Sequence, residues 1–117
     1  MKTHTMTLDT PFFEQIVQNK KHYEIRVFDE KRRKLLLGDK IIFQKRDSDE
    51  TIEKTVSKLM LFDTFKETLE CMKDFREALP SIGTIEEGNS LYENIPHEKG
   101  NYKKASAQFG VVLIKLE

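Results

Sequence analysis

The stretch Lys21-His22-Tyr23-Glu24-Ile25-Arg26 alternates polar and apolar side chains, and with Val27 and Phe28 it predicts a β-strand over residues 22–28. Successive side chains of a strand point to opposite faces, so one face holds Tyr23, Ile25 and Val27, and the other holds His22, Glu24, Arg26 and Phe28. The apolar face is expected to pack on the core. On periodicity alone, the polar face is expected to meet water.

A strand and a short helix are predicted before this stretch. Residues 3–8 alternate and are rich in β-branched side chains, as strands are. Thr10 and Pro11 then predict a helix start, with the threonine as N-cap and the proline in the first turn. Apolar residues follow at helical spacing, and Asn19 stands at the helix end, where a left-handed residue is often needed.

The chain after residue 28 is expected to form a helical turn and then two strands. Residues 29–37 are basic and turn-like, and Gly38-Asp39 predicts a turn before a strand from Lys40 to Phe43. The acidic residues 47–50 predict a hairpin loop, and residues 51–62 predict the long returning strand.

A helix is predicted from residue 64, where Thr64 and Glu67 form a capping box. The apolar stripe that follows ends at Pro80 and Gly83, and it consists of Phe65, Leu69, Met72, Phe75 and Leu79. Cys71 is expected to occupy a buried position on this helix.

A second helix and a last strand complete the chain. Thr84 and Glu87 form another capping box, which predicts a helix to about Asn94 with Leu91 and Ile95 as its buried side. After a polar loop, the apolar run of residues 109–114 predicts a fully buried central strand.

These elements predict a fold of the α+β class, a small, mostly antiparallel β-barrel with flanking helices. The 117 residues suffice for a single domain over residues 1–117, and 38% hydrophobic with 34% charged residues indicates a soluble protein. No apolar run exceeds four residues, so no membrane span is expected. With one cysteine no internal disulfide can form, and we expect a cytoplasmic protein.

The formal net charge is zero, yet the charges are separated along the chain. Residues 20–46 carry ten basic and four acidic side chains, a local excess of +6. Such an excess attracts phosphates if folding gathers it on one side. Solvated loop lysines are the other interpretation, and charge alone leaves both open.

Lys21, Glu24 and Arg26 are the candidate site residues. A buried lysine can become reactive if its pKa falls, and a nearby carboxylate can hold it charged or accept its proton. An arginine fork binds a carboxylate, a phosphate or the carbonyl edge of a base. The histidines at positions 4, 22 and 97 lack the spacing of metal ligands, so neither a metal nor another cofactor is expected.

The pattern Lys-x-x-Glu-x-Arg after a short helix, followed by an arginine-containing loop and Gly-Asp-x-Ile-x-Phe, resembles the ASCH domain family. The matching residues are Lys21, Glu24, Arg26, Arg32 or Arg33, and residues 38–43. Residues 109–112 are similar to the family's final strand. Asn19 stands where the family usually has glycine, although asparagine also adopts the left-handed backbone.

The resemblance implies a PUA-like β-barrel with a cleft between barrel and helices where a nucleotide or nucleoside would bind. One branch of the family is an amidohydrolase that deacetylates N4-acetylcytidine with a lysine, a threonine and a glutamate. Lys21 falls on the lysine position, but Glu24 occupies the threonine position. Glu86 and Glu87 are the nearest candidates for the glutamate.

Three hypotheses follow. The first is a module that binds RNA or a nucleotide through Lys21, Glu24, Arg26, Arg32 and Arg33, with the segment from Lys31 to Lys34 holding phosphates. The second is an amidohydrolase for an acylated nucleoside, with Lys21 and Glu24 as catalytic residues. The third is a regulatory protein that uses its surface for protein contacts. Phe28 is expected either to stack on a base or to cover the barrel.

Overall fold

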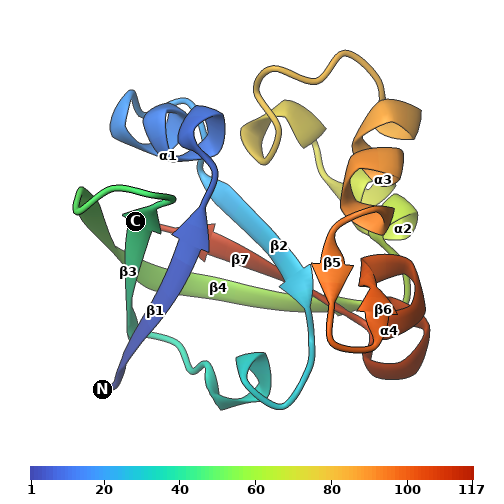
Figure 1. The fold of residues 1–117 in the computed structure, drawn as a ribbon, viewed down its shortest axis with the longest axis horizontal. Helices are drawn as coiled ribbons and strands as arrows, with labels where there is room; N and C mark the ends of the chain where they lie inside the picture. Colours follow the sequence, from blue (N-terminus) through green and yellow to red (C-terminus); the bar gives the residue numbers. More distant parts are fainter.

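The computed structural model describes residues 1–117 and contains a curled sheet of five strands (Figure 1). The strands lie in the order β1-β3-β4-β7-β2. Their bounds are β1 Thr3–Leu8, β2 Tyr23–Val27, β3 Lys40–Lys45, β4 Thr51–Phe62 and β7 Val111–Leu116.

β1 runs parallel to β3, whereas the other three pairings are antiparallel. This confirms the α+β class with a mixed, mostly antiparallel sheet. β1 and β2 form the two edges and do not pair with each other, so the sheet is a half-barrel with an open seam.

Three of the four helices gather beside one end of the sheet, next to a small hairpin (Figure 1). These are α2 (Phe65–Cys71), α3 (Ile85–Glu93) and α4 (Tyr102–Phe109), and the hairpin is β5 (Pro96–His97) with β6 (Gly100–Asn101). The first helix, α1 (Thr10–Val17), lies apart from them. Two short 3-10 helices, η1 (Arg32–Lys34) and η2 (Phe75–Glu77), complete the elements.

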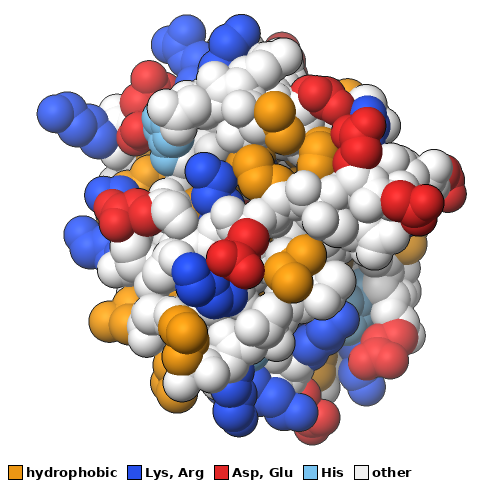
Figure 2. Space-filling model, turned by 90° about the vertical axis from the view of Figure 1, so that its left-hand side faces the viewer, with side chains coloured by type: hydrophobic (Ala, Val, Ile, Leu, Met, Phe, Trp, Pro, Cys, Tyr) orange, Lys and Arg blue, Asp and Glu red, His pale blue; other side chains and the backbone are white.

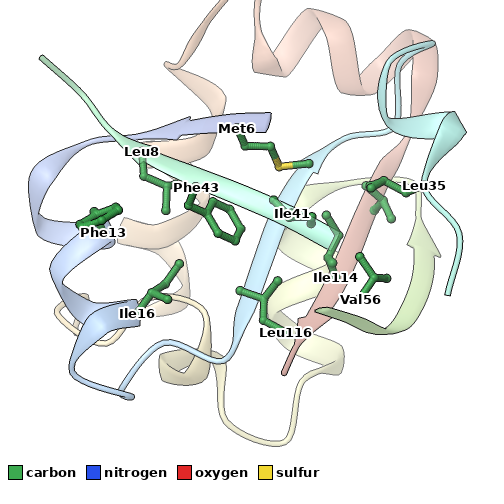
Figure 3. Packing of buried hydrophobic residues seen from close by; sticks show 11 residues of the cluster. Met6, Leu8, Phe13, Ile16, Leu35, Ile41, Phe43, Val56, Ile114 and Leu116 are labelled. Atoms are coloured by element: carbon green, nitrogen blue, oxygen red, sulfur yellow. The ribbon is translucent and has the colours of Figure 1, made fainter. Parts of the chain in front are cut away.

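Each face of the sheet has its own apolar cluster. One cluster fills the curl of the half-barrel (Figure 3), and the other lies between the sheet and α2, α3 and α4. β7 serves both, since Val112 and Ile114 enter the curl while Val111 and Leu113 meet the helices. All four of these side chains are essentially buried, which confirms the predicted central strand.

The helix predicted from residue 64 is too long, although Thr64 forms the predicted N-cap. The Thr64 hydroxyl accepts from the Glu67 N–H, but α2 ends at Cys71 and Met72 has an extended backbone. The Asp74 carboxylate then accepts from the Arg76 N–H and starts η2, so a local side-chain bond competes with the helix. Cys71 is exposed rather than buried.

Smaller corrections concern the other helices. Asp9 rather than Thr10 is the N-cap of α1. The loop predicted before the last strand contains α4, whose Asn101 cap accepts from the Lys104 N–H. Gly110, with φ +79°, separates α4 from β7, so Phe109 is helical and the strand begins at Val111.

Asp39 is a buried carboxylate that holds β1 to the turn before β3. It accepts hydrogen bonds from the backbone N–H groups of Lys2 and Leu36, both at 3.0 Å, and its other partner is His4 Nε2 at 2.8 Å. The bond from the Lys2 N–H, with those from His4 and Leu36, outweighs desolvation and lowers the Asp39 pKa to about 2. The carboxylate is therefore stabilised in its charged form.

This lowered pKa predicts a pH dependence of unfolding. An unfolded aspartate titrates at about pH 4, so the stabilisation from Asp39 is complete above that value and is lost as the pH falls toward 2. An Asp39→Asn variant lacks this charge at every pH. We therefore expect urea unfolding to show a stability gap between wild type and variant at pH 6 that narrows at pH 2.5, and a constant gap would contradict the assignment.

None of the helices has the length and apolar character needed to cross a lipid bilayer. The cytoplasmic location expected from the sequence stays a prediction.

Candidate functional site

A cavity of about 510 Å³ lies along the open seam, between the end of β1, the outer edge of β2 and helix α3. Its size is in the range of small-molecule sites. Its charged floor comprises Lys21, Glu24 and Arg26. Its aromatic walls and its rim comprise Phe12, Tyr92, Tyr102, Thr7, Asp9 and Arg46.

Lys21 reaches the floor from the turn between α1 and β2, and only 1% of its side chain is exposed. Its Nζ donates to the carbonyl oxygens of Tyr23 at 2.8 Å and Ala78 at 2.6 Å, and it lies 3.2 Å from Glu24 Oε1. An ammonium group has three N–H donors, so all three are used within the chain.

Glu24 is the centre of the charged floor, and its side chain is 5% exposed. Oε1 faces Lys21 and accepts the Ile25 N–H at 3.2 Å, while Oε2 accepts Arg26 Nε at 3.0 Å and lies 2.9 Å from Nη2. The polar face of β2 therefore points into the cavity, and its predicted exposure to water is wrong for Glu24. The reason is that the half-barrel curls around this face.

The three charges change one another's pKa. Burial lowers the pKa of Lys21 despite its attraction to Glu24. Burial opposes the charged form of Glu24 as well, but the cations of Lys21 and Arg26 together outweigh it and hold its pKa below the usual range. The floor has two basic side chains and one carboxylate, so it presents a net positive charge to the cavity.

Arg26 also spans the open seam. Its Nη2 donates at 3.0 Å to the carbonyl oxygen of Thr7 on β1, the opposite edge of the sheet. Nε and Nη2 thus bond to Glu24 and Thr7. Nη1 bonds to neither a main-chain group nor a carboxylate. Of the five N–H donors of Arg26, Nε and Nη2 use three and the Tyr102 hydroxyl accepts one more, so one Nη1 N–H is left for a ligand.

An aromatic stack supports one wall of the cavity. The Phe65 ring lies between the rings of Tyr92 and Tyr102, at centroid distances of 4.8 and 5.6 Å and nearly parallel to both. Phe65 itself is buried. Burial, with the nearby Glu24 carboxylate, raises the pKa of Tyr92 well above its ordinary value, and the Tyr92 hydroxyl has no hydrogen-bond partner in the chain. That hydroxyl is free to bind a ligand.

The comparisons with known proteins identify the family. The model of the ASCH domain matches residues 6–117. The chain belongs to the ASCH domain family.

Solved structures agree with this assignment. A crystal structure of hypothetical protein PH0355 is 32% identical, with a TM-score of 0.82, over 100% of this chain and 98% of the other. A solution structure of protein PF0455 from Pyrococcus furiosus is 31% identical, with a TM-score of 0.73, over 100% of this chain and 96% of the other. No curated protein matches this chain.

This ASCH domain brings three of the five predicted ligand-binding residues together, namely Lys21, Glu24 and Arg26. Arg32 and Arg33 lie outside the cavity. Arg32 pairs with Asp29 at 3.3 Å, and the Arg33 guanidinium lies 4.4 Å from the centroid of the Phe28 ring. Phe28 also packs on the cluster inside the curl, which corresponds to the second of its two predicted roles.

Most of the basic residues in the local excess are paired with acidic side chains. Six of the ten basic side chains in residues 20–46 have an acidic partner: Lys21, Arg26, Arg32, Lys40, Lys45 and Arg46. Figure 2 shows acidic and basic side chains interspersed over the visible face. Ion pairs formed in the folded chain therefore offset much of the basic excess of residues 20–46.

Other candidates lie away from the cavity of this ASCH domain. Glu86 and Glu87 are exposed in the first turn of α3 and do not line it. His22 pairs with Glu77 and the Asn19 carbonyl oxygen, also outside the cavity. The only other carboxylate in the lining is that of Asp9, which is paired with Arg46 at the rim.

Sequence reasoning missed Tyr92, because it assigned Leu91 and Ile95 to the buried side of α3. The structure buries Gly88 and Tyr92, and it places Leu91 and Ile95 along the cavity. A signal existed in Gly88, since a Cβ there would lie 2.8 Å from Leu79 Cδ1. A glycine inside a helix often marks such close packing, and Tyr92 lies on the same face one turn later.

Proposed function

We propose that the cavity binds a nucleoside or nucleotide, either free or as an unpaired residue of RNA. The observation that carries the proposal is the buried floor of Lys21, Glu24 and Arg26 beneath the aromatic walls of a cavity of about 510 Å³. Aromatic side chains and arginine planes are the common partners of splayed-out bases. The net positive floor and Arg46 at the rim suit a ligand with acceptor oxygens.

Arg32, Arg33 and the segment from Lys31 to Lys34 have a separate place in this proposal. Because they lie outside the cavity, they are proposed to contact the phosphates of a longer RNA rather than the bound base. Binding of a single nucleoside is then expected to be insensitive to salt, whereas RNA binding weakens as salt rises. Calorimetric titration of uridine, guanosine and a short single-stranded RNA at 50 and 200 mM salt measures both.

A conservative variant tests the cavity itself. Tyr92→Phe removes only the unpartnered hydroxyl, and we expect it to weaken nucleoside binding about 3- to 10-fold, the equivalent of roughly 1 kcal/mol. Tyr23→Phe is the matched control, because Tyr23 lies on the same strand as the charged floor but does not line the cavity. Equal weakening in both variants, or no binding of any nucleoside or RNA by the wild type, would contradict the proposal.

The lowered pKa of Lys21 supports a second candidate function, hydrolysis of an acylated nucleoside such as N4-acetylcytidine. Water would add to the acyl carbon, the C–N bond would break, and acetate and cytidine would leave. Lys21 and Glu24 would be the catalytic residues. Two observations weigh against this role, since all three N–H donors of Lys21 are occupied and neither predicted glutamate of α3 lines the cavity.

Chromatography of the reaction products decides between binding and hydrolysis. Incubation of the wild type with N4-acetylcytidine should leave it unchanged if the protein only binds. Release of cytidine that disappears in Lys21→Met would support the amidohydrolase, and release that persists in that variant would exclude Lys21 as a catalytic residue.

A further inference from the structure

The outer edge of β2 presents backbone groups that do not bond with a neighbouring strand. His22 accepts from the Leu116 N–H, and the Phe28 N–H donates to Gly110, so the even-numbered residues bond with β7. In an antiparallel pair the backbone groups of the alternate residues point away from the partner strand. Those of Tyr23, Ile25 and Val27 therefore point out of the sheet edge.

The charged floor already occupies two of these outward groups. Lys21 Nζ donates to the Tyr23 carbonyl oxygen at 2.8 Å, and Glu24 Oε1 accepts the Ile25 N–H at 3.2 Å. An added β-strand would need both groups, so β2 is closed to pairing with a peptide. The Arg26 bridge to Thr7 further narrows the seam. What remains is room for a small ligand.

The Ile25 carbonyl oxygen remains without a donor in the chain, although Ile25 is 1% exposed and lines the cavity. Buried main-chain carbonyls nearly always accept a hydrogen bond from the protein, from water or from a ligand. The next residue, Arg26, also bonds to the Tyr102 hydroxyl and keeps one Nη1 N–H that no group of the chain accepts. Two consecutive residues of the lining thus present a main-chain acceptor and a side-chain donor.

We propose that this acceptor and donor read the Watson–Crick edge of an unpaired nucleobase. The Ile25 carbonyl oxygen accepts an N–H of the base, and Arg26 Nη1 donates to a ring carbonyl oxygen or nitrogen. The inference rests on the proposed function and deepens it, because it specifies the base rather than the phosphate as the group that the cavity recognises. A phosphate ester that has lost its protons carries no donor for the Ile25 carbonyl oxygen and would leave that oxygen unpaired.

Methylated nucleosides test the inference. The probes are uridine with 3-methyluridine, guanosine with 1-methylguanosine, and ribose 5-phosphate, each titrated calorimetrically into the wild-type protein. Methylation at these positions removes the N–H on the Watson–Crick edge while the ring and its carbonyls remain. We expect the better-binding parent nucleoside to lose at least 10-fold in affinity on methylation, and ribose 5-phosphate to bind more weakly than either parent.

An Arg26→Lys variant supplies an independent readout, because lysine retains the charge opposite Glu24 but lacks Nη1. It should weaken the parent nucleoside, with Arg33→Lys as a control outside the cavity and thermal unfolding as a check on folding. Equal affinity for parent and methylated nucleosides, or tighter binding of ribose 5-phosphate, would overturn the base-reading inference alone. Absence of binding by every probe would overturn the proposed function and the inference with it.

Discussion

Replacing Glu24 by glutamine is expected to lower the free energy of unfolding by about 3–5 kcal/mol. The carboxylate is buried, and it is the shared partner of Lys21 Nζ at 3.2 Å and Arg26 Nη2 at 2.9 Å. Glutamine is close to glutamate in size but leaves two buried cations without a counter-ion. Urea unfolding followed by circular dichroism at pH 7 measures the loss.

The pH dependence of Glu24→Gln separates lost charge pairing from lost packing. Without the carboxylate the pKa of Lys21 should fall further, because attraction to Glu24 is what opposes the effect of burial. The variant can then release the lysine proton as the pH rises, so its deficit relative to wild type should shrink between pH 7 and pH 9.5. The matched control is the double variant Lys21→Met with Glu24→Gln, which should recover part of the lost stability. A deficit that is independent of pH and unchanged by the second substitution would contradict the role assigned to the charged floor.

Replacing Phe65 by alanine is expected to cost about 3–5 kcal/mol and to weaken nucleoside binding as well. The ring is buried, and it separates Tyr92 and Tyr102 at 4.8 and 5.6 Å. Its removal leaves a void between the two tyrosines that line the cavity. Thermal unfolding with calorimetric titration of the same sample measures both effects.

Phe75→Ala is the matched control for Phe65. Phe75 packs on the same apolar cluster but is only partly buried, and it neither lines the cavity nor stacks on a cavity tyrosine. We expect a smaller loss of stability and an unchanged affinity in the folded protein. If the two variants weaken binding equally at matched fractions folded, the stack does not position the cavity wall.

The sequence pattern predicted part of the arrangement of Lys21, Glu24 and Arg26. Alternation in the strand placed Glu24 and Arg26 on one face, and the resemblance to the ASCH domain assigned that face to a cleft. Neither the alternation nor the resemblance indicated how deeply these side chains are buried. The buried position of Lys21 involves a distant segment of the chain, since its Nζ donates at 2.6 Å to the carbonyl oxygen of Ala78, 57 positions away in the sequence.

Arg32 and Arg33 show the opposite case. Their nearness to the motif in sequence suggested one binding surface, but η1 turns them toward Asp29 and the Phe28 ring. The chain leaves β2 at Val27, and none of residues 27–34 lines the cavity.

The sequence by itself determined the features that depend on local geometry. Alternation placed β2 and β4, capping boxes began α2 and α3, and the order of the motifs identified the family. Each of these rests on hydrogen bonds or side-chain directions within a few residues, which a pattern can encode. Local signals also misjudged the end of α2, where the bond from Asp74 competes with the helix.

The tertiary structure alone decided the composition of the cavity. Tyr92, Phe65 and Tyr102 come from three helices and stack only because the half-barrel and the helical layer meet at the open seam. The same curl turned the polar face of β2 inward, so Glu24 lies among cations instead of in water. Contacts between distant segments depend on how the whole chain packs, and no local pattern specifies that.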